Sequence, residues 1–370
     1  MKLGAFVMPS HPPERPLLDG VRWDLEHLVQ LDRLGFHEAW IGEHFTAPWE
    51  PNPAPDLLIA QALPRTQRIK LCPGAHLLPY HHPIELAHRV AFLDQLAQGR
   101  YMLGVGISAL PSDLALYAVD AAGGQNRRMT MEALEIMLRV WRGEPFSFDG
   151  EFWKVRPPKS DFEFLKLHVK PFQKPHPPIG IAGLSPGSET LKIAGERGFI
   201  PLSISLNNAH TASHWTSVEA GAARSGRTPD RREWRLVREV YVAGTDDEAR
   251  KRVREGAMGR CWREYLLPFY VGSGMGPQFL AHPSHSALKL DVDYLIENSW
   301  FVGSPRTVID KIGALQRATG GFGGLLIMIY DFSTEPEWWN ESLQRLVAEV
   351  LPHFPDSQAE RAVSPRRTES

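Results

Sequence analysis

Apolar side chains follow two alternating patterns along the chain, which predict alternating strands and helices. Short, nearly continuous apolar runs are typical of buried strands, and they occupy residues 2–8, 38–42, 69–78 and 101–107. After the first run, apolar positions recur every three or four residues over 21–36, as on one buried helix face. Strands that alternate with helices predict a parallel sheet joined by right-handed crossovers.

The alternation continues through most of the chain. Further strands are expected at residues 178–183, 199–204, 234–244 and 323–330. Helices are expected at residues 21–36, 55–63, 83–99 and 127–141, from about residues 186, 209 and 246, and at 335–351. These segments make eight strand–helix units, which is the number that closes a (β/α)8 TIM barrel. We therefore predict the α/β class and this barrel.

Two stretches interrupt the alternation and are predicted to be insertions. Residues 144–177 are rich in aromatic side chains and proline, and residues 258–300 are rich in glycine, proline, histidine and aromatic side chains. We expect one barrel domain over residues 1–352, followed by a polar tail at 353–370 that is expected to be disordered.

Composition narrows the class of protein further. The 370 residues are 43% hydrophobic and 23% charged, which predicts a globular chain with a large core. The formal net charge is −2 without a stripe of Lys and Arg, so nothing indicates a nucleic acid partner. No apolar run is long enough to cross a bilayer, and the first residues lack the features of a signal peptide. The two cysteines, Cys72 and Cys261, exclude a disulfide framework and fit the cytoplasm.

Two motifs have ordinary interpretations that we prefer. The sequence "GVGISA" at Gly104–Ala109 fits a dinucleotide-binding pattern, but no helix begins inside it and no acidic strand end follows. Its glycines would instead let a flat ligand approach the barrel backbone. His210 and His214 have the i, i+4 spacing of metal ligands, but neither the glutamate of H-E-x-x-H nor a third ligand is evident. We interpret such histidines as solvated and predict no metal site.

Two other segments are candidates for chemistry. Glu43 and His44 directly follow a predicted strand, and residues at the carboxyl ends of barrel strands surround the active site. The segment "GLSPGSETLKIAGERG" spans residues 183–198, and a helix is expected to begin within it, near Pro186. Ser185 could simply cap that helix. Alternatively, its free amides, Ser185 and Ser188 could bind a phosphate, with Arg127 or Arg128 as a counter-charge.

Together these segments resemble the luciferase-like two-component monooxygenase family over about residues 1–350. The resemblance rests on "EHF", "GAHLLPYHHP", "GRYMLGVG", "GLSPGSETLKIAGERG" and "FVGSPRTVIDKI". Within the family, the chain looks most like limonene 1,2-monooxygenases and diketocamphane monooxygenases. That closer likeness rests on "PAPDLLIAQAL", "HLLPYHHP", "GRCWREYLLP" and "ATGGFGG".

The resemblance implies a TIM barrel with FMN across the carboxyl ends of its strands. His44 then corresponds to the active-site histidine of the family, and Ala75–His76 to a non-proline cis peptide beneath the flavin. The remaining cofactor contacts would be Gly106 and Ile107 beside the isoalloxazine, and Arg128, Gly183, Leu184, Ser185 and Ser188 near the phosphate. Ile107 departs from members that have arginine there, which places more of the phosphate charge on Arg128.

The resemblance also implies the chemistry. Reduced FMN and O2 form a C4a-peroxyflavin, which attacks a carbonyl or transfers oxygen to an alkene of a small apolar, cyclic or terpene-like substrate. A histidine near neutral pKa suits the choice between these states. Trp40, Phe45 and Trp49 would contact the substrate and, with the second insertion, would exclude water. Reduced FMN would come from a separate NAD(P)H:flavin reductase, and a homodimer is expected. The alternatives are an F420-dependent oxidoreductase, a non-catalytic flavin-binding protein, and a monooxygenase of polyketides or other natural products.

Overall fold

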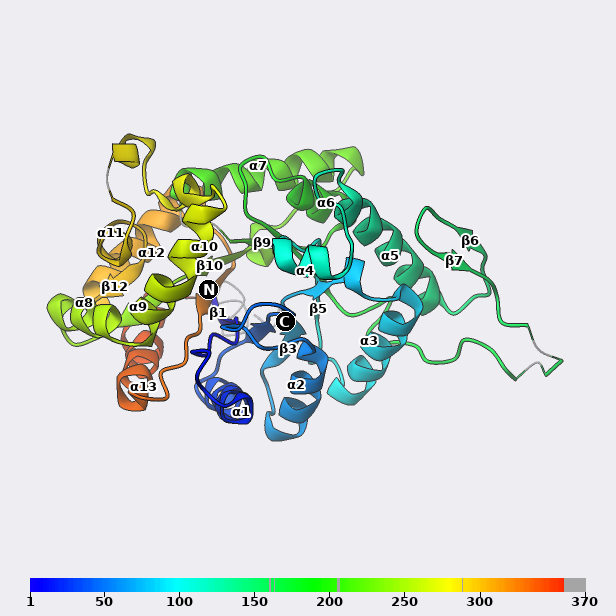
Figure 1. The fold of residues 1–370 in the computed structure, drawn as a ribbon, viewed down its shortest axis with the longest axis horizontal. Coiled ribbons are helices and arrows are strands. Elements are labelled where there is room, and N and C mark those ends of the chain that lie inside the picture. The colour runs from blue at the N-terminus through cyan, green and yellow to red at the C-terminus, as the bar shows by residue number, and fades with distance from the viewer. Residues whose placement is uncertain (160, 163, 205–206, 288, 356–370) are drawn as a thin grey trace, which may run out of the picture.

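The strands close into the barrel that the sequence predicts (Figure 1). This computed structural model describes residues 1–159, 161–162, 164–204, 207–287 and 289–355. The barrel strands are β1 (Lys2–Val7), β2 (Glu38–Ile41), β3 (Lys70–Pro73), β4 (His76–Leu77), β5 (Leu103–Gly106), β8 (Ile179–Gly183), β9 (Ile200–Ser203), β10 (Arg235–Arg238) and β13 (Gly324–Met328). Neighbouring strands pair in the order β3-β2-β1-β13-β10-β9-β8-β5-β4.

The third predicted strand, 69–78, is divided in the structure. Its first half, β3, pairs with β2, and its second half, β4, pairs with β5. Because β3 and β4 are the two ends of the sheet and also follow one another in the chain, they close the barrel. Counted together as one strand, they give the eight strands that the pattern predicts.

Helices surround these strands (Figure 1). They are α1 (Leu17–Arg33), α2 (Pro55–Ala62), α3 (Pro83–Ala97), α4 (Pro111–Leu116), α5 (Gln125–Arg142), α6 (Glu189–Arg197), α7 (Asn208–Arg224), α8 (Asp246–Glu255), α12 (Pro305–Thr319) and α13 (Pro336–Arg345). None of the described helices has both the length and the apolar composition needed to cross a membrane.

Both predicted insertions contain secondary structure of their own. The first includes an antiparallel pair, β6 (Phe148–Asp149) and β7 (Lys154–Val155), which extends from the side of the barrel (Figure 1). The second contains α9 (Ala257–Cys261), a π-helical turn at Trp262–Leu266, α10 (Leu267–Gly272) and α11 (Val292–Asn298). The predicted strand 234–244 divides into β10 and β11 (Val240–Val242), and β11 pairs with β12 (Phe301–Gly303) outside the barrel sheet.

Trp40 fills the middle of the barrel. It lies opposite Phe6 in the β1–β2 register, and its side chain is 0% exposed. Two glycines leave room for the indole, because a Cβ at Gly180 would lie 2.5 Å from Trp40 Cη2 and one at Gly104 would lie 3.2 Å from Cζ3. The ring therefore forms the boundary between the lower barrel and the space above it.

A buried ion pair lies below Trp40. Arg235 Nε donates to Glu38 Oε1 at 2.8 Å, and Trp40 Nε1 donates to the same oxygen at 3.0 Å. Burial opposes ionisation of Glu38, but the charge of Arg235 and the hydrogen bonds from His37, Arg235 and Trp40 outweigh it and lower the pKa. The two charges thus compensate each other inside the barrel.

Candidate active site

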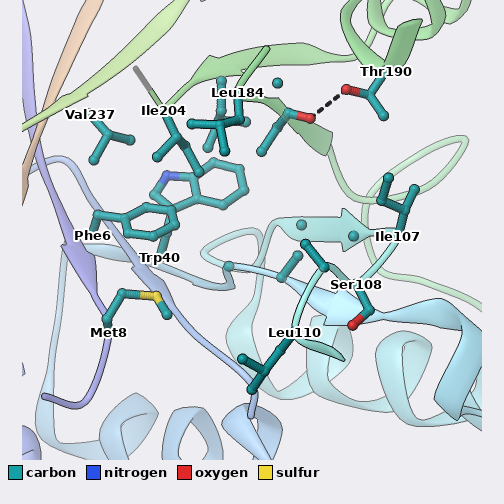
Figure 2. Close-up of a pocket in the computed structure, with 18 of the residues that line it drawn as sticks. Phe6, Met8, Trp40, Ile107, Ser108, Leu110, Leu184, Thr190, Ile204 and Val237 are labelled. Carbon is teal, nitrogen blue, oxygen red and sulfur yellow. Dashed lines mark hydrogen bonds between the residues drawn. The ribbon is translucent and has the colours of Figure 1, made fainter. Parts of the chain in front are cut away.

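A cavity of about 480 Å³ lies at the carboxyl ends of the barrel strands. Figure 2 shows Phe6, Trp40 and Val237 together on one side, and Ile107 and Ser108 on the other. The cavity falls within the volume range of small-molecule and cofactor sites. Its position matches the face where TIM barrels place their active sites.

His44 lines this cavity, as predicted for a residue at the end of β2. Its Nε2 lies 3.1 Å from Glu50 Oε2, and its Nδ1 lies 3.4 Å from Asp113 Oδ2. Burial opposes protonation of His44, but the carboxylates of Glu50 and Asp113 outweigh it and raise the pKa. The raised pKa favours the imidazolium form of His44 in the cavity wall.

Asp113 itself is held in the ionised state. Burial raises the pKa of Asp113, but hydrogen bonds from His44, the Thr46 side chain and the Phe45 backbone outweigh it, so the net shift is downward. The Thr46 amide donates to Asp113 Oδ1 at 2.8 Å. Neither Asp113 nor Glu50 was predicted from the sequence as a partner of His44. Asp113 is 69 residues away in the chain, and only the barrel brings the two together.

Glu43, the other member of the predicted pair, also lines the cavity and forms a second cluster with two histidines. Its Oε2 accepts a hydrogen bond from His76 Nδ1 at 2.6 Å, and its Oε1 accepts one from His81 Nε2 at 2.8 Å. Burial raises the pKa of Glu43, but the two imidazoles outweigh it and lower the pKa to about 2. These three residues are metal-ligand types, yet the separations are those of charge-assisted hydrogen bonds.

The position of the cis peptide corrects one prediction. The non-proline cis bond joins Gly74 to Ala75, not Ala75 to His76. The cis peptide bond therefore lies one residue earlier than the resemblance implies. Gly74 is the position without room for a side chain, since a Cβ there would lie 2.7 Å from the Cβ of Trp40. Ala75 lines the cavity, whereas the His76 side chain is buried beside Glu43.

Gly106 and Ile107 also line the cavity, on the side facing Trp40. A Cβ at Gly106 would lie 2.9 Å from Leu77 Cδ2 and 3.2 Å from Ala75 Cβ. The missing side chain at Gly106 thus lets Leu77 and Ala75 pack directly against its backbone, where β4 pairs with β5.

The segment from Gly183 to Thr190 forms the polar end of the cavity. Gly183, Leu184, Ser185 and Ser188 all line it. The helix begins at Glu189 rather than near Pro186, and Ser188 rather than Ser185 is its N-cap, accepting from the Leu191 amide at 3.4 Å. Ser185 is therefore free of the capping role and lies exposed at the mouth of the cavity.

His214 holds this polar segment in place. Its Nε2 donates to the Ser185 carbonyl at 3.1 Å, and its Nδ1 lies 2.9 Å from Ser203 Oγ. The expectation that His214 is solvated was wrong, because the side chain is buried and burial lowers its pKa to about 4. A neutral imidazole is suited to this role as a positioned donor.

The predicted arginine is displaced by one residue. Arg128 lies outside the cavity wall, is 52% exposed and pairs with Glu151 at 3.0 Å. Arg127 lines the cavity instead, near Glu189. Successive helix residues point about 100° apart. Which of the two arginines faces the cavity therefore depends on how α5 is rotated about its axis, which the sequence does not give. Of the two arginines that the sequence offers as a counter-charge, Arg127 is the one that lines the cavity.

The three aromatic residues predicted to contact substrate have different positions. Trp40 forms the floor of the cavity. Phe45 packs edge-on against Tyr80 and Tyr117, and Trp49 stacks on Tyr265. Phe45 and Trp49 are not among the lining residues, so their predicted substrate contact is corrected. Trp49 instead supports Tyr265, which does line the cavity.

The second insertion covers the cavity, as predicted. It contributes Trp262, Tyr265, Leu266, Phe269, Tyr270, Met275 and Phe279. Tyr265 also donates to Glu50 Oε2 at 3.3 Å, which connects the cover to the partner of His44. The cover is largely aromatic and therefore limits the access of water to the space beneath it.

Comparisons with known proteins give a family model and several relatives. A family model described as luciferase-like monooxygenase matches residues 1–321. The 3,6-diketocamphane 1,6-monooxygenase of Pseudomonas putida is 34% identical over 369 residues, covering 95% of this chain and 98% of that protein. Limonene 1,2-monooxygenase of Rhodococcus erythropolis is 33% identical over 360 residues, covering 95% of this chain and 86% of that protein.

A solved structure shows the same fold. It is the oxygenating constituent of 3,6-diketocamphane monooxygenase from Pseudomonas putida, a type II Baeyer–Villiger monooxygenase in complex with FMN. The TM-score is 0.90 at 35% sequence identity, and the match covers 96% of this chain and 99% of that chain.

Proposed function

The chain belongs to the luciferase-like monooxygenase family, and we propose that it is an FMN-dependent monooxygenase that uses reduced FMN and O2. Its substrate is a small apolar molecule, cyclic or terpene-like, and the reaction is a Baeyer–Villiger insertion or an epoxidation. The observation that carries this proposal is the cavity that combines a glycine-lined slot, a polar phosphate end, His44 and an aromatic cover. The relatives with diketocamphane and limonene in their names support the class of substrate.

The residues of the cavity fit FMN. Ala75, Gly106 and Ile107 would hold the isoalloxazine, since all three line the cavity and Gly106 has no side chain to project into it. The amides that open α6, together with Ser185, would hold the phosphate. Arg127 would supply the charge that Ile107 does not.

When bound, reduced FMN supplies the electrons that activate O2. The residues of this chain bind, orient and shield. His44, protonated and fixed by Glu50 and Asp113, would hold a proton at the cavity wall for the oxygen-transfer step. Trp40 lies at the floor, and aromatic residues of the second insertion line the other end, so both would limit the access of water to the reacting atoms.

Electrons would come from a separate partner. The solved relative is named as an oxygenating constituent, which supports a two-component system with an NAD(P)H:flavin reductase. We also propose a homodimer, which a molar mass measurement in solution would test. Leu57 on α2 and Phe92 and Leu96 on α3 are exposed apolar side chains that support such an interface.

An oxygen-labelling experiment tests the proposed function. The protein loaded with reduced FMN, given 18O2 and a panel of cyclic ketones and alkenes, should release a product that carries one labelled oxygen atom. Turnover with reduced F420 in the absence of O2 would show an oxidoreductase of the deazaflavin type instead. Tight FMN binding with no turnover on either cofactor would show a non-catalytic flavin-binding protein.

The phosphate site gives a second prediction. Replacing Arg127 and Ser185 together by alanine should weaken FMN binding by about ten- to a hundred-fold, because hydrogen bonds to a charged group are lost. Riboflavin binding should change little, since riboflavin has no phosphate. Titration of both flavins into each variant provides the measurement.

The neighbouring arginine provides the matched control. Arg128→Ala removes the same type of side chain from the same helix, but this arginine pairs with Glu151 outside the cavity. It should leave the affinity for both flavins unchanged. Equal losses for FMN and riboflavin in the double variant would mean that the phosphate binds elsewhere.

A further inference from the structure

Glu239 faces the cavity from the end of β10. Side chains alternate along a strand, and Val237, two residues earlier, belongs to the barrel interior and lies beside Trp40 and Phe6 in Figure 2. Glu239 continues this inward face, lines the cavity and is 4% exposed. A carboxyl group is therefore placed in the wall of an otherwise largely apolar chamber.

One oxygen of this carboxyl has no protein partner. Glu239 Oε1 lies 3.4 Å from the Tyr330 hydroxyl, which accepts a hydrogen bond from Trp262 Nε1 at 2.7 Å. Oε2 is buried and has no hydrogen-bond partner among the residues that the structure describes. Buried polar atoms are nearly always paired, so an unpaired oxygen in a cavity wall indicates a ligand group that completes it.

The adjacent arginine does not pair with Glu239. Arg238 points to the other face of β10, where its guanidinium donates to Thr211 Oγ1 at 2.9 Å and to the Val237 carbonyl at 2.8 Å. Burial raises the pKa of Glu239 to about 7, although its own backbone amide, Arg238 and Tyr330 lower it. A substantial fraction of the molecules therefore carries a proton on this carboxyl at neutral pH.

The other groups around Glu239 do not titrate near neutral pH. Burial raises the pKa values of Cys261, Tyr270 and Tyr330 above their usual range. Burial lowers the pKa of Arg238 only to about 10, so it remains charged. Glu50 also lines the cavity, and burial raises its pKa as well. The pH dependence that belongs to Glu239 is therefore the part that the Glu239→Gln variant removes.

We propose that Glu239, in its protonated form, donates a hydrogen bond from the unpaired oxygen to a carbonyl oxygen of the substrate, so that the site selects cyclic ketones over alkenes. This proposal rests on the proposed function and deepens it, because it assigns a substrate class and a specificity residue to the same cavity. The donor would also polarise the carbonyl and make its carbon a better electrophile. An alkene has no acceptor, and its binding would leave the carboxyl unpaired.

Binding measurements test this proposal without requiring turnover. Norcamphor, a bicyclic ketone, and norbornene, an alkene with the same skeleton, are titrated into the FMN-loaded protein and its Glu239→Leu and Glu239→Gln variants. Glu239→Leu should weaken norcamphor about three- to ten-fold, the loss of one hydrogen bond, and leave norbornene unchanged or tighter. Glu239→Gln keeps an N–H donor and should retain most of the affinity for the ketone.

The pH dependence distinguishes the protonated donor from a merely apolar wall. In the wild type, affinity for norcamphor should fall as the pH rises through about 7, whereas in Glu239→Gln it should be flat across the same range. Glu264→Gln, on the exposed side of the second insertion, removes a carboxylate outside the cavity and is the control. If Glu239→Leu does not fold, the pH profiles of the wild type and Glu239→Gln still show whether protonated Glu239 binds the ketone.

Parallel changes in ketone and alkene affinity, or identical pH profiles in wild type and Glu239→Gln, would overturn the role of Glu239. These results are separable from failure of the proposed function. Binding of norcamphor through Glu239 without incorporation of label from 18O2 would support the inferred contact. The same result would contradict the proposed monooxygenase function.

Discussion

Replacing His44 by alanine should lower the rate of product formation by about 10²- to 10⁴-fold, the usual contribution of a positioned acid or base. The affinity for FMN should be largely kept, because the residues expected to hold the ring and the phosphate lie on other segments. More hydrogen peroxide should be released per flavin oxidised, because slower oxygen transfer to the substrate leaves more time for the release of peroxide. Product yield and peroxide in single-turnover reactions measure both effects.

The pH profile gives the same prediction a direction. The pKa of His44 is raised, so the imidazolium persists to a higher pH than in a free histidine and is lost as the pH rises through that raised value. Activity that depends on the imidazolium should therefore decline on the alkaline side, and this decline should vanish in His44→Ala. His82→Ala, an exposed histidine outside the cavity wall, is the control. Wild-type coupling in His44→Ala would remove His44 from the mechanism.

The ion pair beneath Trp40 should have the largest effect on stability. Arg235→Met leaves the Glu38 carboxylate buried without its counter-charge, and breaking a buried pair in this way costs about 3–5 kcal/mol. Both side chains are almost fully buried and bonded at 2.8 Å, so solvent cannot replace the missing partner. Denaturant unfolding followed by fluorescence and circular dichroism gives the free energy of unfolding.

A double variant separates charge from packing. Glu38→Gln combined with Arg235→Met removes both charges and should recover most of the lost stability, because no unpaired ion remains in the barrel. A double variant as unstable as Arg235→Met alone would mean that the shape of the arginine, rather than its charge, stabilises the barrel.

The barrel was predictable because its signals are local. Apolar runs, proline at helix starts and glycine at helix ends are each read within a few residues. The sequence also placed His44 correctly, since a residue directly after a barrel strand must reach the carboxyl-end face. The alternation of side chains along β10 also places Glu239 on the inward face with Val237.

The incorrect residue assignments occurred where a shift of one residue changes which side chain or peptide bond faces the cavity. Arg127 and Arg128 differ only in the rotation of α5, and Gly74–Ala75 differs from Ala75–His76 by one peptide bond. The α6 N-cap moved from Ser185 to Ser188 because Pro186 is not the first helical residue. Asp113 reaches the site through contacts distant in sequence, which no local pattern encodes.

The division of the cavity between segments has an evolutionary consequence. The cover comes from one continuous stretch, residues 262–279, whereas the glycine-lined and polar parts of the wall come from the segments after β3, β5 and β8. Mutations or recombination within that single stretch can therefore diversify the compounds a lineage oxidises while the inherited flavin cradle is conserved. Tyr265 is the exception, because its bond to Glu50 ties the variable stretch to the partner of His44. Selection should accordingly constrain Tyr265 more tightly than its neighbours in the cover.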